Sequence, residues 1–273
     1  SIIVSYVSDV VHERLVAVLK CSSSTGQAFV DMLSEVLDKM GLSKTMCIGN
    51  ATDGASNMQG QYKGFSSLLS AQSPNQVHVW CYAHVLNLVL ANTTQIVIES
   101  GSLFALLNGI AVFIKESYQR MNVWEESGRN KRRKRLAPIG ETRCRAKHEA
   151  LKKVFGSFGK PEDGLYVDVL LTLSAIQKQA IVKPCVRVMA RGYAESLLKY
   201  ETILTAQIFL RIFEHTSPLS KYLQTAGLDV HSAHRMVAST QDTLKSLGRD
   251  FKSVKKSSRH ICQLDKHRNP RER

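Results

Sequence analysis

The sequence predicts an α/β fold that continues into a mostly helical region, and three observations lead to this prediction. Short β-branched runs alternate with helical patterns over roughly the first 100 residues. Beyond about Gly101, only helical periodicity is found. Apolar residues make up 44% of the 273 residues, which is enough for a sizeable core. We therefore expect an α/β core with a mixed sheet at residues 1–100 and a helical region at residues 101–273.

The first elements are two strands and a helix. Ile2–Val7 and Val11–Leu19 are rich in apolar residues and are separated by the turn signal Ser8-Asp9, so they predict an antiparallel pair. In the helix that follows, Ser24 or Thr25 can cap the start and Gly41 can end it. Its apolar face consists of Phe29, Met32, Leu33, Val36, Leu37 and Met40.

The remaining elements of the α/β region alternate. Lys44–Ile48 predicts a short strand that leads into a loop at Gly49–Gly54. Phe65–Leu69 predicts a helix, and Gln76–Cys81 a strand that runs into the helix His84–Ala91. Strands separated in this way need crossovers, which indicates parallel pairing later in the sheet.

The second region is predicted to consist of helices. Leu103–Trp124 is one of them, and Arg129–Pro138 is a basic loop. Pro161, Pro184 and Pro218 mark breaks. Further helical patterns cover Leu165–Ala180, Val186–Tyr200, Thr202–His215, Leu219–Leu223 and Ala233–Leu247. The last twenty or so residues are basic, and we expect a frayed tail there.

The net charge of +14 is concentrated in two segments. Residues 129–153 hold 11 Lys and Arg against Glu141 and Glu149, which gives +9. Residues 251–273 hold eight Lys and Arg against Asp265 and Glu272, which gives +6. A nearly neutral body with two basic segments suits contact with a polyanion or a localisation signal.

Cysteine usage and hydropathy exclude several classes. The six cysteines form no Cys-x-x-Cys pair, which argues against a secreted disulfide scaffold and favours a reducing, intracellular compartment. No apolar run reaches the roughly 18 residues of a membrane span, and Leu103–Ile114 reads as a buried helix, so we expect no membrane contact. No leader peptide is recognisable, and a chain that begins at Ser1 reads as an internal piece.

The stretch from Asp53 to Gly64 carries the strongest functional signal. Asp53 follows a predicted buried strand, which places its carboxylate at the edge of a sheet. Gly54, Gly60 and Gly64 allow tight turns and close backbone approach, and Asn57 can bond to the loop. Taken alone, Asp-Gly is also an ordinary turn signal.

Cys81 and His84 are three residues apart at the start of a predicted helix, so both side chains can face the same way. They could supply two zinc ligands. A buried thiol and a hydrogen-bonded histidine are the alternative, because His231 and His234 lie far along the chain in a different kind of segment. Trp80 and Trp124 are predicted to be core residues rather than base-stacking platforms.

Together these segments resemble the hAT-type transposase domain. The resemblance rests on Asp53-Gly-Ala-Ser-Asn-Met58 and on Cys81-Tyr-Ala-His84 followed by Leu86-Asn-Leu88. It is closest to transposon-derived proteins similar to the MYM-type zinc-finger proteins and to the DUF4371 proteins associated with a TTF-type zinc finger. It continues through Phe113–Arg120, Gly140–Cys144, Ser217–Gln224, Thr240 and Leu244.

The resemblance implies an RNase H-like core interrupted by a helical insertion. It also implies that two Asp and one Glu hold two Mg²⁺ or Mn²⁺ ions for DNA cleavage and strand transfer. Asp53 matches the second aspartate. Gly54, Asn57, Gly60, Cys81, His84 and Asn87 match structural positions. Cys144 stands where the family has a tryptophan, and a thiol cannot stack on a base.

Two family positions lie outside the sequence. The first aspartate is expected before Ser1 and the last acidic residue beyond Arg273. One carboxylate of three does not hold a two-metal site, so we expect a catalytically inactive fragment with a vestigial Asp53. We also expect no metal or other cofactor unless a longer chain completes the triad.

The basic loop 129–135 predicts nuclear import or contact with phosphates, with a solvated charge run as the alternative. The nucleic-acid-binding candidates are Arg129, Lys131, Arg132, Arg133, Lys134, Arg135 and Arg143. We therefore expect a transposon-derived nuclear protein that binds DNA or a protein partner and has no small-molecule substrate. The alternatives are part of an active transposase, a protein-interaction module, and a fragment without function.

Overall fold

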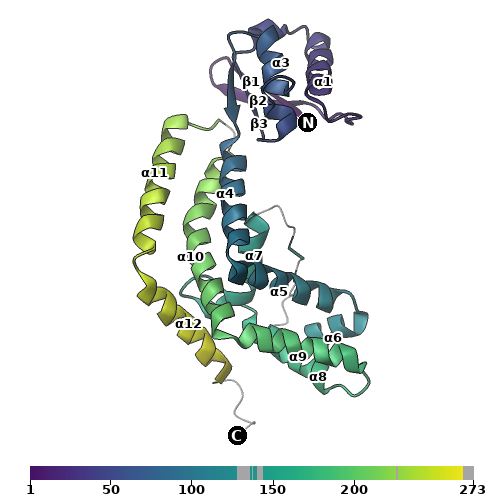
Figure 1. Ribbon diagram of the computed structural model, residues 1–273, viewed down its shortest axis with the longest axis vertical. Coiled ribbons are helices and arrows are strands. Elements are labelled where there is room, and N and C mark those ends of the chain that lie inside the picture. Colours follow the sequence, from purple (N-terminus) through teal and green to yellow (C-terminus); the bar gives the residue numbers. More distant parts are fainter. Residues whose placement is uncertain (128–135, 137, 140–143, 226, 267–273) are drawn as a thin grey trace. The chain divides into compact units, whose positions relative to one another are not determined.

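The computed structural model describes residues 1–127, 136, 138–139, 144–225 and 227–266; for residues 144, 265 and 266 it describes the backbone only. Helices predominate over strands within these residues (Figure 1). The chain divides into two compact units. Unit 1 comprises Ser1–Val89 and Ser220–Ala233, and unit 2 comprises Leu90–Leu219 and His234–Arg273.

Unit 1 contains two small sheets. Strands β1 (Ile2–Val7) and β2 (Val11–Ala17) form an antiparallel hairpin, as predicted. Strands β3 (Gly49–Thr52) and β4 (Val77–Trp80) pair in parallel, with Thr52 opposite Trp80. The described residues therefore form two separate sheets of two strands instead of the expected single mixed sheet, because each strand hydrogen-bonds to one neighbour only.

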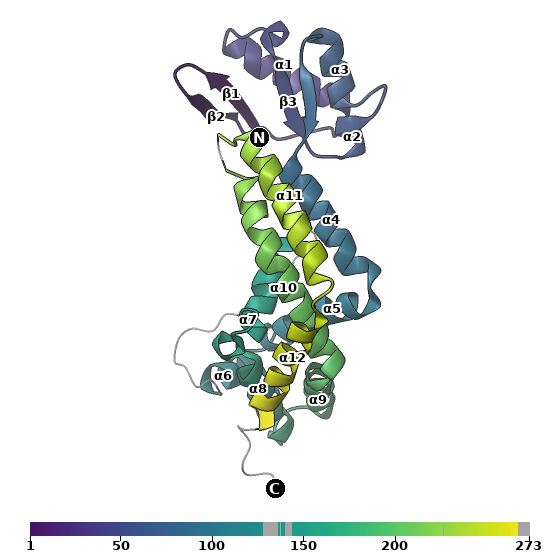
Figure 2. The ribbon, with the colours of Figure 1, turned by 90° about the vertical axis from the view of Figure 1, so that its left-hand side faces the viewer.

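One face of the β1–β2 hairpin is apolar and uncovered (Figure 2). Ile3 pairs with Leu15, and Val7 pairs with Val11. Side chains two residues apart share a face of a strand, so these four lie on the same side. Their exposed fractions are 61%, 62%, 73% and 55% respectively. The hairpin is thus held by its own ladder and turn rather than by a core.

The helices of unit 1 follow the predicted pattern closely. Helix α1 (Gly26–Lys39) begins after Thr25, whose Oγ1 accepts a hydrogen bond from the Ala28 N–H at 3.3 Å. It ends before Gly41, which adopts the left-handed conformation with φ 66°. Helices α2 (Ser56–Gln59), α3 (Phe65–Gln72) and α4 (Tyr82–Ile96) come next, and α4 continues into unit 2.

The predicted strand Lys44–Ile48 is wrong. This segment contains the 3₁₀ helix η1 (Lys44–Met46), and the strand begins at Gly49, inside the predicted loop. Ser43 Oγ accepts a hydrogen bond from the Thr45 N–H, and Ser73 Oγ donates to the Lys44 carbonyl at 2.6 Å. These local bonds satisfy backbone groups that a strand would need for its ladder.

Unit 2 is built from helices. They are α5 (Ile98–Lys115), α6 (Tyr118–Glu126), α7 (Cys144–Phe155), η2 (Pro161–Asp163), α8 (Tyr166–Lys178), α9 (Pro184–Leu198), α10 (Tyr200–Tyr222), α11 (Val230–Leu247) and α12 (Phe251–Lys266). Its core includes Phe113, Trp124, Phe155 and Phe213, all at most 2% exposed. Trp124 is therefore a core residue as predicted, whereas Trp80 in unit 1 is 48% exposed, so the core assignment for Trp80 is wrong.

Helix α5 is long and apolar enough to cross a membrane by length and composition, unlike the shorter segment Leu103–Ile114 considered from the sequence. Eight of its residues are buried within the fold, among them Leu103, Ile110 and Phe113. The core helix of a globular unit meets the same criteria of length and composition, and the burial of α5 is that of a core helix.

Three further predictions in unit 2 need correction. The helix Leu103–Trp124 is interrupted at Ser117, whose hydroxyl caps α6 by accepting from the Arg120 N–H. Pro218 lies inside α10 instead of ending it. Its cost is offset by the burial of Thr216 and Leu219, at 1% and 3% exposed. The tail is a packed helix, α12, as far as Lys266.

Close backbone contact joins α1 to the Gly60–Gly64 turn. A Cβ on Gly26 would lie 2.3 Å from the Lys63 carbonyl oxygen, and a Cβ on Gly64 would lie 2.3 Å from the Gly60 nitrogen. Only glycine permits this approach, which brings Phe65 and Leu69 of α3 against Val30 of α1.

We expect Gly64→Ala to lower the stability of unit 1 by at least about 1–3 kcal/mol, because backbone atoms occupy the space of the new methyl group. Gly54→Ala is the matched control, since its methyl group would meet only the Trp80 ring at an ordinary 3.7 Å. Hydrogen exchange of the α1 and α3 amides measures the effect. Equal protection in both variants would show that the contact does not hold the helices together.

Candidate functional site

Asp53 lies at the carboxyl end of β3, as predicted, but the strand before it is only half-buried. The carboxylate is exposed, and Oδ1 accepts a hydrogen bond from the Ala55 N–H at 3.3 Å. The Cys81 N–H donates to the Thr52 carbonyl at 2.9 Å, so Asp53 and Cys81 follow neighbouring strands at one edge of the sheet. This edge is where ligands bind in open α/β sheets.

The other residues of the Asp53–Gly60 segment serve the local structure. Asn57 Nδ2 donates to the Ser24 carbonyl at 2.9 Å, which fixes the loop before α1. Gly60 accepts from Ser67 Oγ at 2.9 Å and forms the turn toward Gly64. Gly54 lies beside the Trp80 ring. The resemblance assigns structural roles to Gly54, Asn57 and Gly60, and these contacts agree with such roles.

His78 forms a polar network that sequence reasoning missed, having treated it as an ordinary strand residue. Gln59 Nε2 donates to His78 Nε2, so the proton lies on Nδ1, which donates to Asn50 Oδ1. Asn50 Nδ2 in turn donates to Gln76 Oε1. Burial lowers the pKa of His78 and favours this neutral form. The network ties α2 to both strands of the parallel pair.

Cys81 and His84 are both half-buried, and Cys81 is a free thiol. Asn87, one turn further along α4, is half-buried as well. Among the described residues, no three His, Cys, Asp or Glu side chains are grouped closely enough to hold a metal ion. His231 and His234 are exposed near the start of α11. The described residues thus do not fit a zinc site at Cys81 and His84 or a two-metal centre at Asp53.

The predicted basic loop lies outside the described residues. This applies to Arg129, Lys131, Arg132, Arg133, Lys134, Arg135 and Arg143, and to the side chain of Cys144. One cation of the same basic segment, Lys147, is 6% exposed, and its Nζ donates to Thr94 Oγ1 at 2.6 Å. Lys147 therefore joins α7 to α4 and does not face solvent.

Helix α12 presents the main basic surface of the described residues. Val254, Ser258 and Ile261 point into unit 2 and are at most 5% exposed. The opposite side carries exposed polar side chains that border a groove of about 770 Å³. Its lining includes Lys252, Lys255, Lys256, Arg259, His260 and Gln263 of α12, together with Phe158 and Gly159 from the loop after α7. We call this lining the α12 groove.

Buried polar contacts fix α12 to α10. Arg211 donates to the Asp250 carboxylate at 3.0 Å and to the Ser253 hydroxyl at the start of α12. This hydrogen bond with Arg211 holds the pKa of the Asp250 carboxyl below its usual range. Ser257 Oγ donates to Gln207 Oε1 at 2.7 Å one turn later. The basic side of α12 is thus held in a fixed orientation.

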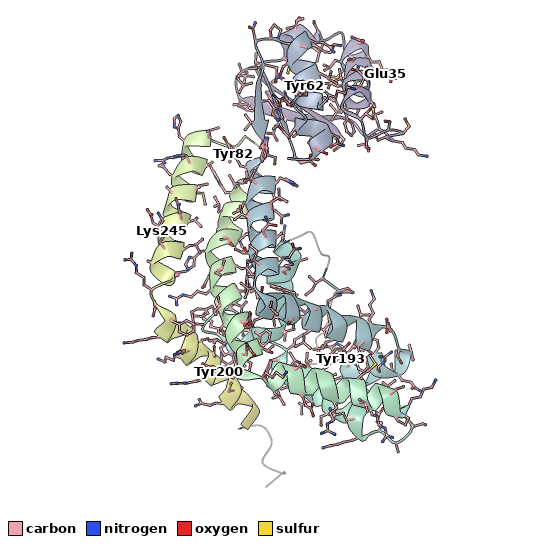
Figure 3. The ribbon with its side chains drawn as sticks, viewed as in Figure 1. Glu35, Tyr62, Tyr82, Tyr193, Tyr200 and Lys245 are labelled. Atoms are coloured by element: carbon pink, nitrogen blue, oxygen red, sulfur yellow. The ribbon has the colours of Figure 1, made fainter. Side chains whose placement is uncertain are left out.

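A second, smaller groove of about 510 Å³ borders the same helix. Lys255, Arg259 and Gln263 line both grooves, and Tyr200 at the start of α10 and Cys262 complete the second one. Figure 3 shows Tyr200 beside α12. The basic row therefore lies between two aromatic side chains, Phe158 and Tyr200.

The spacing of Phe251, Val254, Ser258 and Ile261 is the signal that could have located α12 in the sequence. The high charge of the tail masked this period. In the α/β region, the sequence did indicate the class of the fold. Residues 1–64, from β1 to the Gly60–Gly64 turn, have the strand, helix and strand order of an α/β unit and hold Asp53 at the sheet edge.

A family model matches this segment: residues 1–64 are similar to the DUF4371 family, described as the ZMYM1/FAM200 RNase-like domain. The match includes both hairpin strands, α1, β3 and α2. It supports the predicted family for this part of the chain. No solved structure matched the chain.

We expect the stability of unit 1 to fall as the pH drops below about 6.5, the ordinary pKa of histidine. The pKa of His78 is lowered in the folded state, so the unfolded chain binds a proton at a pH where the folded chain does not. Stability from this group is complete above that pH and declines below it.

Denaturant unfolding between about pH 5 and 7.5 tests this expectation, with His78→Asn as the comparison. Burial also lowers the pKa of His148 in unit 2, and the comparison cancels that contribution because His148 is present in both proteins. The difference in unfolding free energy between the two proteins should grow with pH. A difference that does not change with pH contradicts the role given to His78.

Proposed function

We propose that this is a transposon-derived nuclear protein that binds nucleic acid through the α12 groove and does not itself cut nucleic acid. The observation that carries the proposal is the composition of the groove, which is lined by Lys252, Lys255, Lys256 and Arg259 and, within the described residues, by no carboxylate. Grouped cations on one face are the usual electrostatic basis of phosphate binding.

The chemistry of these cations suits a phosphate backbone. Lys255, Lys256 and Arg259 are exposed, so their charges keep access to solvent and to a ligand. Their hydrocarbon stems leave the buried side of α12 to Val254 and Ile261. A polyanion that binds here would release its counterions, which drives association at low salt.

Two further observations support the transposon origin and the nuclear location. Residues 1–64 are similar to an RNase-like family, and the segments at 53–58 and 81–88 resemble the hAT-type domain. The basic run 129–135 in the sequence has the composition of a nuclear import signal and would add to the positive field of the same chain.

We expect Lys255→Gln with Arg259→Gln to weaken binding to a labelled oligonucleotide and to reduce the salt dependence. Each lost phosphate contact should lower the slope of log K against log salt by about 0.7–0.9. Lys245→Gln is the matched control, because Lys245 lies on α11 and pairs with Asp242 at 3.6 Å. Absence of binding by the unaltered chain at low salt would remove the proposal.

The position of Asp53 favours one alternative, metal-dependent cleavage by a longer chain. Its carboxylate is exposed at a sheet edge, where a first ligand of a metal centre could lie. The capping bond from the Ala55 N–H occupies only one of its two oxygens.

We expect the 273-residue chain to show no Mg²⁺- or Mn²⁺-dependent nicking of a supercoiled plasmid, because one carboxylate does not hold two metals. Asp53→Asn should leave this background unchanged. Nicking that appears with the unaltered chain and disappears in Asp53→Asn, while Asp9→Asn retains it, would establish the alternative function.

A further inference from the structure

The two aromatic side chains beside the basic row of α12 carry an inference about the kind of nucleic acid that binds. Phe158 lines one groove and Tyr200 the other, and Lys255 and Arg259 line both. Phe158 is half-buried, and Tyr200 is 43% exposed. Part of each ring is thus open to a ligand that also contacts the cations between them (Figure 3).

The Phe158 ring is held in place before any ligand arrives. The Arg211 guanidinium lies over it, 5.2 Å from the ring centroid, and is itself bonded to Asp250 and Ser253. The loop that carries the ring is closed by a bridge between Ser157 and Lys160. Gly159 turns this loop with a φ of 76°. A fixed ring loses little entropy on stacking.

The cations form one row along the helix. Lys252, Lys255, Lys256, Arg259 and Gln263 lie at the spacing of a single helical face. This row is about 16 Å long, from a rise of 1.5 Å per residue over eleven residues. It is long enough for several consecutive phosphates of one strand.

The carboxylates near the groove are already paired. Glu162 lies 3.5 Å from His260, and Asp250 is bonded to Arg211. Neither groove has an Asp or Glu in its lining among the described residues. The surface therefore presents cations and rings, without a charge that would repel a phosphate from the lining.

We propose that the α12 groove and its neighbour bind single-stranded nucleic acid, with the backbone along Lys255 and Arg259 and bases stacked on Phe158 and Tyr200. The proposal rests on the function proposed above and specifies its ligand. In a duplex, the base faces are stacked on one another and are closed to protein rings, whereas a single strand offers them. A row of cations alone would suit either form, so the rings decide.

The test measures the fluorescence anisotropy of the full chain with labelled oligonucleotides of roughly 20 nucleotides, longer than the ~4–16 that a single-strand module covers. Single-stranded DNA, single-stranded RNA and a duplex of equal length are compared at one low salt concentration. We expect both single strands to bind more tightly than the duplex. Tyr200→Leu and Phe158→Leu should each weaken single-strand binding about 5- to 100-fold and leave duplex binding unchanged.

Tyr118→Leu is the matched control, because Tyr118 is 83% exposed on α6 and lines neither groove. Tyr200→Trp should retain binding, which separates loss of stacking from loss of folding. The inference is overturned if the duplex binds as tightly as the single strands, or if Tyr200→Leu has no effect. In either case, weakened binding in the Lys255 and Arg259 variants would still uphold nucleic-acid binding. Binding of polyglutamate alone would overturn both.

Discussion

The side chain of Arg211 holds together the parts of unit 2 from which the basic surface is built. It bonds to Asp250 and Ser253 where α12 begins, and it lies over Phe158 of the loop after α7. Only 14% of the Arg211 side chain is exposed, so these contacts are made largely away from solvent, where charge-assisted bonds are strong. Without them, α12 would rely on Val254, Ser258 and Ile261 alone, and the cations would lose their fixed relation to the ring.

In unit 1, the residues of the Asp53–Gly64 segment are bound into the architecture. Asn57 holds the loop before α1, and Gly64 allows α3 to approach that helix. Asp53 caps the turn that follows its strand. A fold can keep such a segment for these structural reasons after its chemistry has changed, because the backbone geometry needs the same residue types. Motif residues and catalytic competence are therefore separate questions in this chain.

The elements with clear local periods could be predicted from the sequence, and those set by distant contacts could not. The apolar face of α1, with Thr25 and Gly41 at its ends, located that helix closely. Helix α12 depends on Arg211, which bonds to Asp250 39 residues away, and no local pattern reports such a bond. Trp80 is large and apolar, yet its exposure depends on how few elements cover β4. The cations of α12 were recognised as a basic segment, but their placement between two rings needed the structure.

The uncovered hairpin of unit 1 has a consequence for the behaviour of the chain in solution. Each of its strands pairs on one side only, within the described residues, so each offers a row of backbone N–H and C=O groups to another chain. Ile3, Val7, Val11 and Leu15 add an apolar face beside those edges. Such a combination is a template for intermolecular strand addition and, at high concentration, for aggregation. The charges of Glu13 and Arg14 on β2 are the local features that oppose this growth.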